Sequence, residues 1–203
     1  MSMEFSQKQT IRIVAALLLL TALSQALYTG LSASASEFPR KWLWGTEAVL
    51  FIFLAALAGS ALAQCKKYSL GFSAILVAAI FNFLQVGIGF TQFGPFGAVV
   101  QGVEGMAAAA GSVFAFSFFI YNAAKVLLGL SAVVFGFAET KTGSKWLGYL
   151  TTLVGVVAII SNIIIMTMGR VEGIPSGASG VIATVLIAMC LLKLQSDRTN
   201  TVD

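Results

Sequence analysis

The chain has 203 residues, of which 58% are hydrophobic and only 10% are charged, and its formal net charge is +4. Ordinary soluble domains carry about 25% charged and 45–50% apolar residues, so this composition excludes an ordinary soluble domain. The sequence has no histidine and only two cysteines. Their scarcity argues against haem ligation, a Ser-His-Asp arrangement and the usual zinc or iron–sulfur sites. We therefore predict no metal, no cofactor and no catalytic residues, and an intramembrane enzyme is the least supported class.

Long apolar segments dominate the chain in order from the N-terminus. A hydrocarbon core about 30 Å thick needs roughly 20 apolar residues in helical form, whereas barrel strands alternate over about ten residues. The segments here are continuous, and six are long enough: Ile11–Leu31, Trp42–Gln64, Ser69–Phe90, Ser112–Ala138, Trp146–Met168 and Gly177–Leu194. They predict an all-α, polytopic integral membrane protein that folds as a single bundle of six transmembrane helices.

The basic residues between these segments predict the orientation in the membrane. Eight Lys and Arg residues fall on the side of the two termini and three on the other: Lys8, Arg12, Lys66, Lys67, Lys141, Lys145, Lys193 and Arg198 against Arg40, Lys41 and Arg170. Because Lys and Arg accumulate in cytoplasmic loops, we expect both termini to be cytoplasmic in a multi-pass protein of a bacterial plasma (inner) membrane. These residues form a collar rather than a patch with interleaved aromatic residues, so we expect no nucleic-acid partner.

The connection between the third and fourth segments, residues 91–111, differs from the other loops. It reads TQFGPFGAVVQGVEGMAAAAG and contains one acid, Glu104, without Lys or Arg. Gly94-Pro95-Phe96-Gly97 is typical of a turn, yet the rest is too apolar for an aqueous loop. It is either an outward-facing amphipathic or extended start to the fourth helix, which we favour, or a re-entrant segment covered by protein or water. A long apolar loop of this kind usually has a function.

Lys125 is the most informative residue, because it lies near the middle of the run Ser112–Ala138. A charged side chain at bilayer mid-depth costs about 2.5–3.5 kcal/mol, so it usually faces a protein interior or a wet cavity and marks a functional site. A span shifted to 106–124 would let Lys125 snorkel to the surface. That shift would leave the apolar stretch 126–138 outside the hydrocarbon core, so we favour the central position. A charged Lys125 needs a partner, and Glu104 and Glu47 are the two acids placed to supply one.

Other polar residues within the spans extend this candidate site. Asn82 and Gln85 share one face of the third helix, Tyr121 and Asn122 lie within a turn of the lysine, and Asn162 lies at mid-depth on the fifth helix. Polar side chains avoid lipid, so these faces are expected to converge inside the bundle. They either line a ligand or ion pathway or act as interhelical hydrogen bonds worth about 0.6 kcal/mol each.

The leading hypothesis from the sequence is a small transporter or channel-like membrane protein with a polar path or ligand site around Lys125. In it, Lys125 binds an anionic group or exchanges a proton or an ion-pair partner, and Glu104 with its Gly-rich segment forms the outer mouth. The alternative is a non-catalytic accessory or scaffold subunit of a larger membrane complex. The expected surroundings are the lipid bilayer and either a homo-oligomer or that larger complex.

Overall fold

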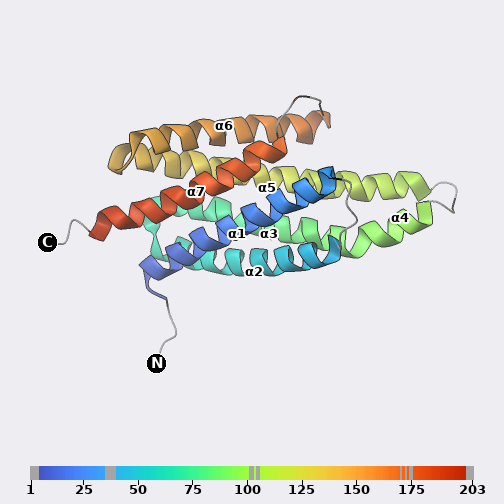
Figure 1. Ribbon diagram of the computed structural model, residues 1–203, viewed down its shortest axis with the longest axis horizontal. Helices are drawn as coiled ribbons and strands as arrows, with labels where there is room; N and C mark the ends of the chain where they lie inside the picture. The colour runs from blue at the N-terminus through green and yellow to red at the C-terminus, as the bar shows by residue number, and fades with distance from the viewer. Residues whose placement is uncertain are drawn as a thin grey trace.

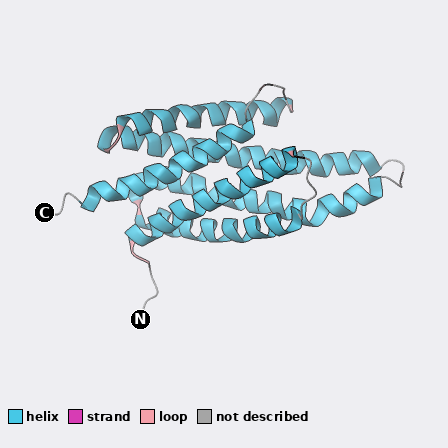
Figure 2. Cartoon of the chain, viewed as in Figure 1, coloured by secondary structure: helices cyan, strands magenta, loops and turns pink. Residues whose placement is uncertain are grey.

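The computed structural model describes residues 5–34, 40–100, 103, 106–169, 171, 173 and 176–199. Within these residues the chain is helical and contains no strand (Figure 2). In chain order the helices are α1 (Gln7–Ala33), α2 (Arg40–Gln64), the 3-10 turn η1 (Lys66–Tyr68), α3 (Ser69–Ile88), the π-helical turn η2 (Gly89–Phe93), α4 (Gly94–Val100), α5 (Met106–Thr142), α6 (Lys145–Met168) and α7 (Ser176–Thr199).

Among the described residues, six helical stretches are long and apolar enough to cross a membrane, which agrees with the prediction of an all-α chain with six helices of spanning length. α1 begins and α7 ends at the same end of the bundle, which we call the terminal end (Figure 1). The other end, where α1 ends and α2 begins, is called the opposite end. The cytoplasmic placement of the terminal end rests on the Lys and Arg distribution and stays a prediction.

The helices α3, η2 and α4 follow one another without a break, so residues 94–100 continue the third span rather than forming the expected turn. Pro95 has no N–H for the carbonyl one turn earlier, and the wider π-helical turn ends two residues before it. Helix α5 begins at Met106, runs for 37 residues and forms a helical hairpin with α4. At 1.5 Å per residue it is about 55 Å long, and its first part extends with α4 past the other helices (Figure 1).

The closest helix contact is the seam between α5 and α6, which is built on glycines. A Cβ atom at Gly136 would lie 2.7 Å from the Thr152 backbone nitrogen, and one at Gly155 would lie 2.7 Å from the Gly129 carbonyl oxygen. Real side chains do not tolerate such distances, so glycine lets the two backbones touch, as small residues do in membrane helices generally. This seam fixes the register of α6 against the centre of α5.

Candidate functional site

Lys125 lies near the midpoint of α5 and is completely buried. Its ammonium Nζ donates a hydrogen bond of 2.6 Å to Oε1 of Gln25 on α1. The same Nζ lies 5.0 Å from the ring centroid of Tyr121, one turn earlier on α5. A cation over an aromatic face is attracted by the electrons of the ring. A buried cation is therefore held by one amide oxygen and one aromatic ring, and neither of these partners carries a negative charge.

The absence of a side chain at Gly180 on α7 makes room for the aliphatic part of Lys125. A Cβ atom built at Gly180 would lie 2.6 Å from Cδ and 3.2 Å from Cγ of the lysine. The lysine stem therefore passes directly against the α7 backbone. Any larger residue at position 180 has to displace this stem, and with it the ammonium group that the stem positions.

Glu47 on α2 is the acid that the structure brings to Lys125. Its carboxyl group is buried and interacts electrostatically with the Lys125 ammonium, but these two described side chains form no direct ion pair. The hydroxyl group of Ser24 on α1 lies beside the carboxyl group. Neither Glu47 Oε1 nor Ser24 Oγ makes a well-directed hydrogen bond. The Lys125 ammonium and the Glu47 carboxyl group thus face the same interior region, and each can still form further hydrogen bonds.

The registers of neighbouring helices place this charge pair at one level of the bundle. Between α1 and α2, the Tyr28 and Trp44 rings lie 6.2 Å apart near one end, and Gln7 Nε2 donates to the Gln64 carbonyl oxygen near the other. This antiparallel register sets Gln25 opposite Glu47. Lys125 reaches Gln25 from α5, so three helices supply side chains to the same depth.

Helix α3 also contributes a side chain at this depth of the bundle. Phe72 stacks on Phe135 with ring centroids 5.2 Å apart, and Phe93 stacks on Phe114 at 4.6 Å. Between these two contacts, α3 runs antiparallel to α5 with Asn82 opposite Lys125. The Asn82 amide donates to the Ala78 carbonyl oxygen at 2.9 Å, while its own Oδ1 is buried without a partner.

The glycine seam and α7 complete the level. The seam aligns Asn162 of α6 with the central part of α5; its amide donates to the Ala158 carbonyl oxygen at 2.7 Å, and its Oδ1 is also buried without a partner. Ser161 and Ser179 join α6 to α7 through a hydroxyl contact of 3.2 Å. We call these residues, which come from all six long helices, the polar layer: Ser24, Gln25, Glu47, Asn82, Lys125, Ser161, Asn162 and Ser179.

Two amide oxygen atoms of the polar layer are buried without a hydrogen-bond donor, Asn82 Oδ1 on α3 and Asn162 Oδ1 on α6, whereas the Ser24 hydroxyl group lies beside the Glu47 carboxyl group. Buried polar atoms nearly always have a partner in folded proteins, so each exception needs an explanation. Chemically, the layer can accept hydrogen bonds from a polar solute or water and can attract a negative group with the Lys125 ammonium.

The structure places seven of the eight predicted site residues. Lys125, Tyr121 and Glu47 cluster together, and Asn82 and Asn162 lie at their level. Asn122 is buried on the face of α5 toward α6, where the seam register sets it at the level of Asn162, and it donates to the Phe118 carbonyl oxygen at 2.7 Å. Gln85 is half-buried about one turn beyond Asn82.

Glu104, the other acid expected near Lys125, lies outside the described residues. Gln25 and Ser24 were not predicted as site residues. Gln25 could have been found from the sequence, because it is a polar amide inside the first apolar segment, as Gln85 is inside the third. No family model, curated protein or solved structure matches this chain, so the case for a function rests on the site alone.

Proposed function

We propose that the protein is a small membrane transporter or channel-like protein that handles its solute or ion at the polar layer. The observation that carries the proposal is the completely buried Lys125 ammonium within a layer of polar groups from all six long helices. Ionisable residues inside membrane bundles are costly and mark substrate or ion pathways. A purely structural layer would be expected to satisfy its own oxygen atoms, whereas the amide oxygens of Asn82 and Asn162 have no donor.

In this proposal the two charges have complementary roles. The Lys125 ammonium attracts the negative group of the solute, and the Gln25 amide oxygen holds the ammonium in place between transport events. The Glu47 carboxyl group is the internal counter-charge that compensates Lys125 when the solute leaves. We further propose the plasma membrane as the location, with both termini cytoplasmic, and a homo-oligomer as the assembly.

Ligand-induced thermal stabilisation tests this proposal in purified protein. A panel of anions, amino acids and lipids is compared on wild type, on Lys125→Met/Glu47→Gln, which removes both buried charges together, and on Lys141→Met. Lys141 also lies on α5, but its ammonium stacks on the Phe137 ring 4.3 Å away, outside the polar layer. We expect a ligand that raises the unfolding midpoint of wild type and Lys141→Met and has no effect on the double variant.

Two results would count against the proposal: no ligand stabilises wild type, or a ligand stabilises the double variant as much as wild type. Either result would favour an accessory subunit. The feature that supports that second candidate is the α4–α5 hairpin. It extends past the other helices (Figure 1), so its end is placed to contact a partner protein.

A further inference from the structure

Four lysines gather at the terminal end of the bundle, on the two short turns that join neighbouring helices there. Lys66 and Lys67 lie in η1, between α2 and α3, and Lys141 and Lys145 flank the turn between α5 and α6. All four side chains are exposed. None of them forms an ion pair within the part of the chain that the structure describes. We call these four residues the lysine cluster.

The packing of α3 on α5 sets the two turns beside each other. The Phe72 and Tyr68 rings both pack on Phe135, with ring centroids 5.2 Å and 5.8 Å away. Lys66 lies six residues before Phe72, and Lys141 lies six residues after Phe135. Because α3 and α5 are antiparallel, both steps lead from the ring contact toward the terminal end by a similar distance. η1 and the end of α5 are therefore neighbours at one level.

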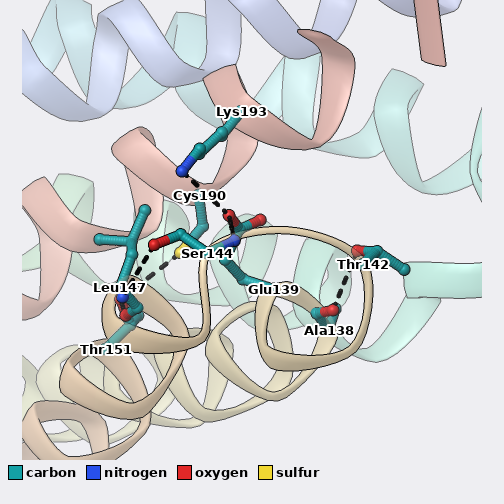
Figure 3. A network of polar contacts seen from close by, with 8 residues as sticks. All are labelled: Ala138, Glu139, Thr142, Ser144, Leu147, Thr151, Cys190 and Lys193. Atoms are coloured by element: carbon teal, nitrogen blue, oxygen red, sulfur yellow. Dashed lines mark hydrogen bonds and ion pairs between the residues drawn. The ribbon is translucent and has the colours of Figure 1, made fainter. Parts of the chain in front are cut away.

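A buried acid fixes the turn between α5 and α6. Glu139 is completely buried, and its Oε1 accepts a hydrogen bond of 2.8 Å from the Ser144 backbone N–H (Figure 3). A Cβ atom at Gly143 would collide with the carboxyl group, so glycine lets the turn close over it. The Lys193 ammonium on α7 lies 3.9 Å from the same Oε1 (Figure 3). Glu139 thus holds the turn from inside and is not exposed to neutralise the lysine cluster.

The other charged groups at the terminal end add positive charge. α1 carries Lys8 and Arg12 there, and both have interactions of their own in the structure. The acidic side chains that the structure describes are Glu47 and Glu139, and both are buried. Within the described residues, the surface of this end therefore presents cations and no exposed carboxylate. Such a surface is complementary to a negatively charged partner.

Aromatic side chains lie beside the lysine cluster on α5 and α6. The Lys141 ammonium lies 4.3 Å from the centroid of the Phe137 ring, one turn earlier. On α6, Trp146 directly follows Lys145 and is 75% exposed, and Tyr149 is also exposed. Trp and Tyr are typical of the level of the lipid headgroups, and Lys side chains extend along apolar surface to place their ammonium groups there. In a chain that crosses a bilayer, the cluster lies at the level of the lipid phosphates.

We propose that the lysine cluster is a binding site for the headgroup phosphate of an anionic phospholipid, whose acyl chains lie along the exposed faces of α5 and α6. Lysine is a compact cation that binds phosphate groups, and basic sites between membrane helices bind anionic headgroups. One headgroup would join η1 to the turn between α5 and α6. Lys141 lies 16 residues after Lys125, about 24 Å along α5, so this site is separate from the polar layer.

Native mass spectrometry of the detergent-purified chain tests this site. Phosphatidylglycerol and phosphatidylcholine with identical acyl chains are titrated separately, and the fraction of protein that carries lipid gives an affinity for each. We expect wild type to bind phosphatidylglycerol more tightly. Lys66→Gln/Lys67→Gln should bind phosphatidylglycerol about tenfold to thirtyfold more weakly and phosphatidylcholine as wild type does. Lys141→Gln/Lys145→Gln should show the same loss, because the two pairs share one headgroup.

The matched control is Arg40→Gln/Lys41→Gln, which removes two cations from the opposite end and should bind phosphatidylglycerol as wild type does. Inorganic phosphate separates a lipid site from a site for free anions, and it should not displace the lipid. The proposal is overturned if wild type binds the two lipids equally, or if either lysine pair can be replaced without loss. An equal loss in the control, or displacement by inorganic phosphate, would also overturn it.

Lys141→Met separates this site from the polar layer. It removes one of the four lysines, so phosphatidylglycerol should bind about fivefold more weakly. A ligand of the polar layer should stabilise the same variant as it does wild type, because the layer is unchanged. All four lysines are exposed, so the variants are expected to fold, which helical circular dichroism checks. Failure of the ligand experiment on the polar layer leaves the lipid affinities unchanged, so the two proposals fail separately.

Discussion

Replacing Lys125 with methionine is expected to lower the free energy of unfolding by about 3–5 kcal/mol while the Glu47 carboxyl group is kept. The reason is that Glu47 interacts electrostatically with Lys125, and removal of the cation leaves a buried carboxylate without compensation. For a chain of this size, that loss corresponds to a fall of roughly 6–20 °C in the thermal midpoint. The midpoint is measured on detergent-purified protein by the loss of helical circular dichroism.

The second half of this experiment is the double variant Lys125→Met/Glu47→Gln. Because both charges are removed together, it should be more stable than the sum of the two single losses predicts, by a coupling of about 1.5–3 kcal/mol. Lys141→Met serves as the control and should unfold close to wild type. Strictly additive effects of the two single changes would contradict the electrostatic link between α2 and α5.

Replacing Gly180 with leucine is expected to abolish ligand-induced stabilisation and to cost about 1–3 kcal/mol by overpacking. The added side chain would occupy the space of Lys125 Cδ and Cγ, so the ammonium would have to leave Gln25. The variant should therefore still fold, but the ligand should no longer raise its unfolding midpoint. Both are measured on the same purified protein, with and without the ligand found in the panel.

Gly177→Leu is the matched control for this change. Gly177 lies on the same helix, and a Cβ atom there would meet nothing within 4 Å. The control should keep both the ligand effect and the unfolding midpoint of wild type. If Gly180→Leu responds to the ligand as Gly177→Leu does, the position of the Lys125 stem does not matter for binding.

The six long apolar helices could be predicted from the sequence, because a helix that crosses lipid needs a continuous apolar run of about 20 residues. The continuation of α3 into α4 could not, because Gly94 and Pro95 are typical of turns and the π-helical turn that accommodates them leaves no sequence signature. Likewise, Glu139 reads as a loop residue beside Lys141, and only the closure of the turn by Gly143 and the approach of α7 bury it.

The candidate site was partly predictable for a similar reason. Lys125 and Glu47 stand out because charges are rare inside apolar segments, and their convergence follows from the cost of exposing them to lipid. The choice of Gln25 as the direct partner of Lys125 depends on the register between helices, which is set by ring contacts such as that of Tyr28 with Trp44. Register of this kind is a property of the packed bundle and is not visible in one helix at a time.

The central claim, that the polar layer handles a solute, is tested most directly by uptake into sealed liposomes. Wild type and Lys125→Met/Glu47→Gln are reconstituted at equal density, and accumulation of the stabilising ligand from the panel is followed over time. The account predicts saturable uptake by wild type, with the double variant at the level of protein-free liposomes. Equal uptake by both proteins, or no uptake by wild type above protein-free liposomes, would contradict it.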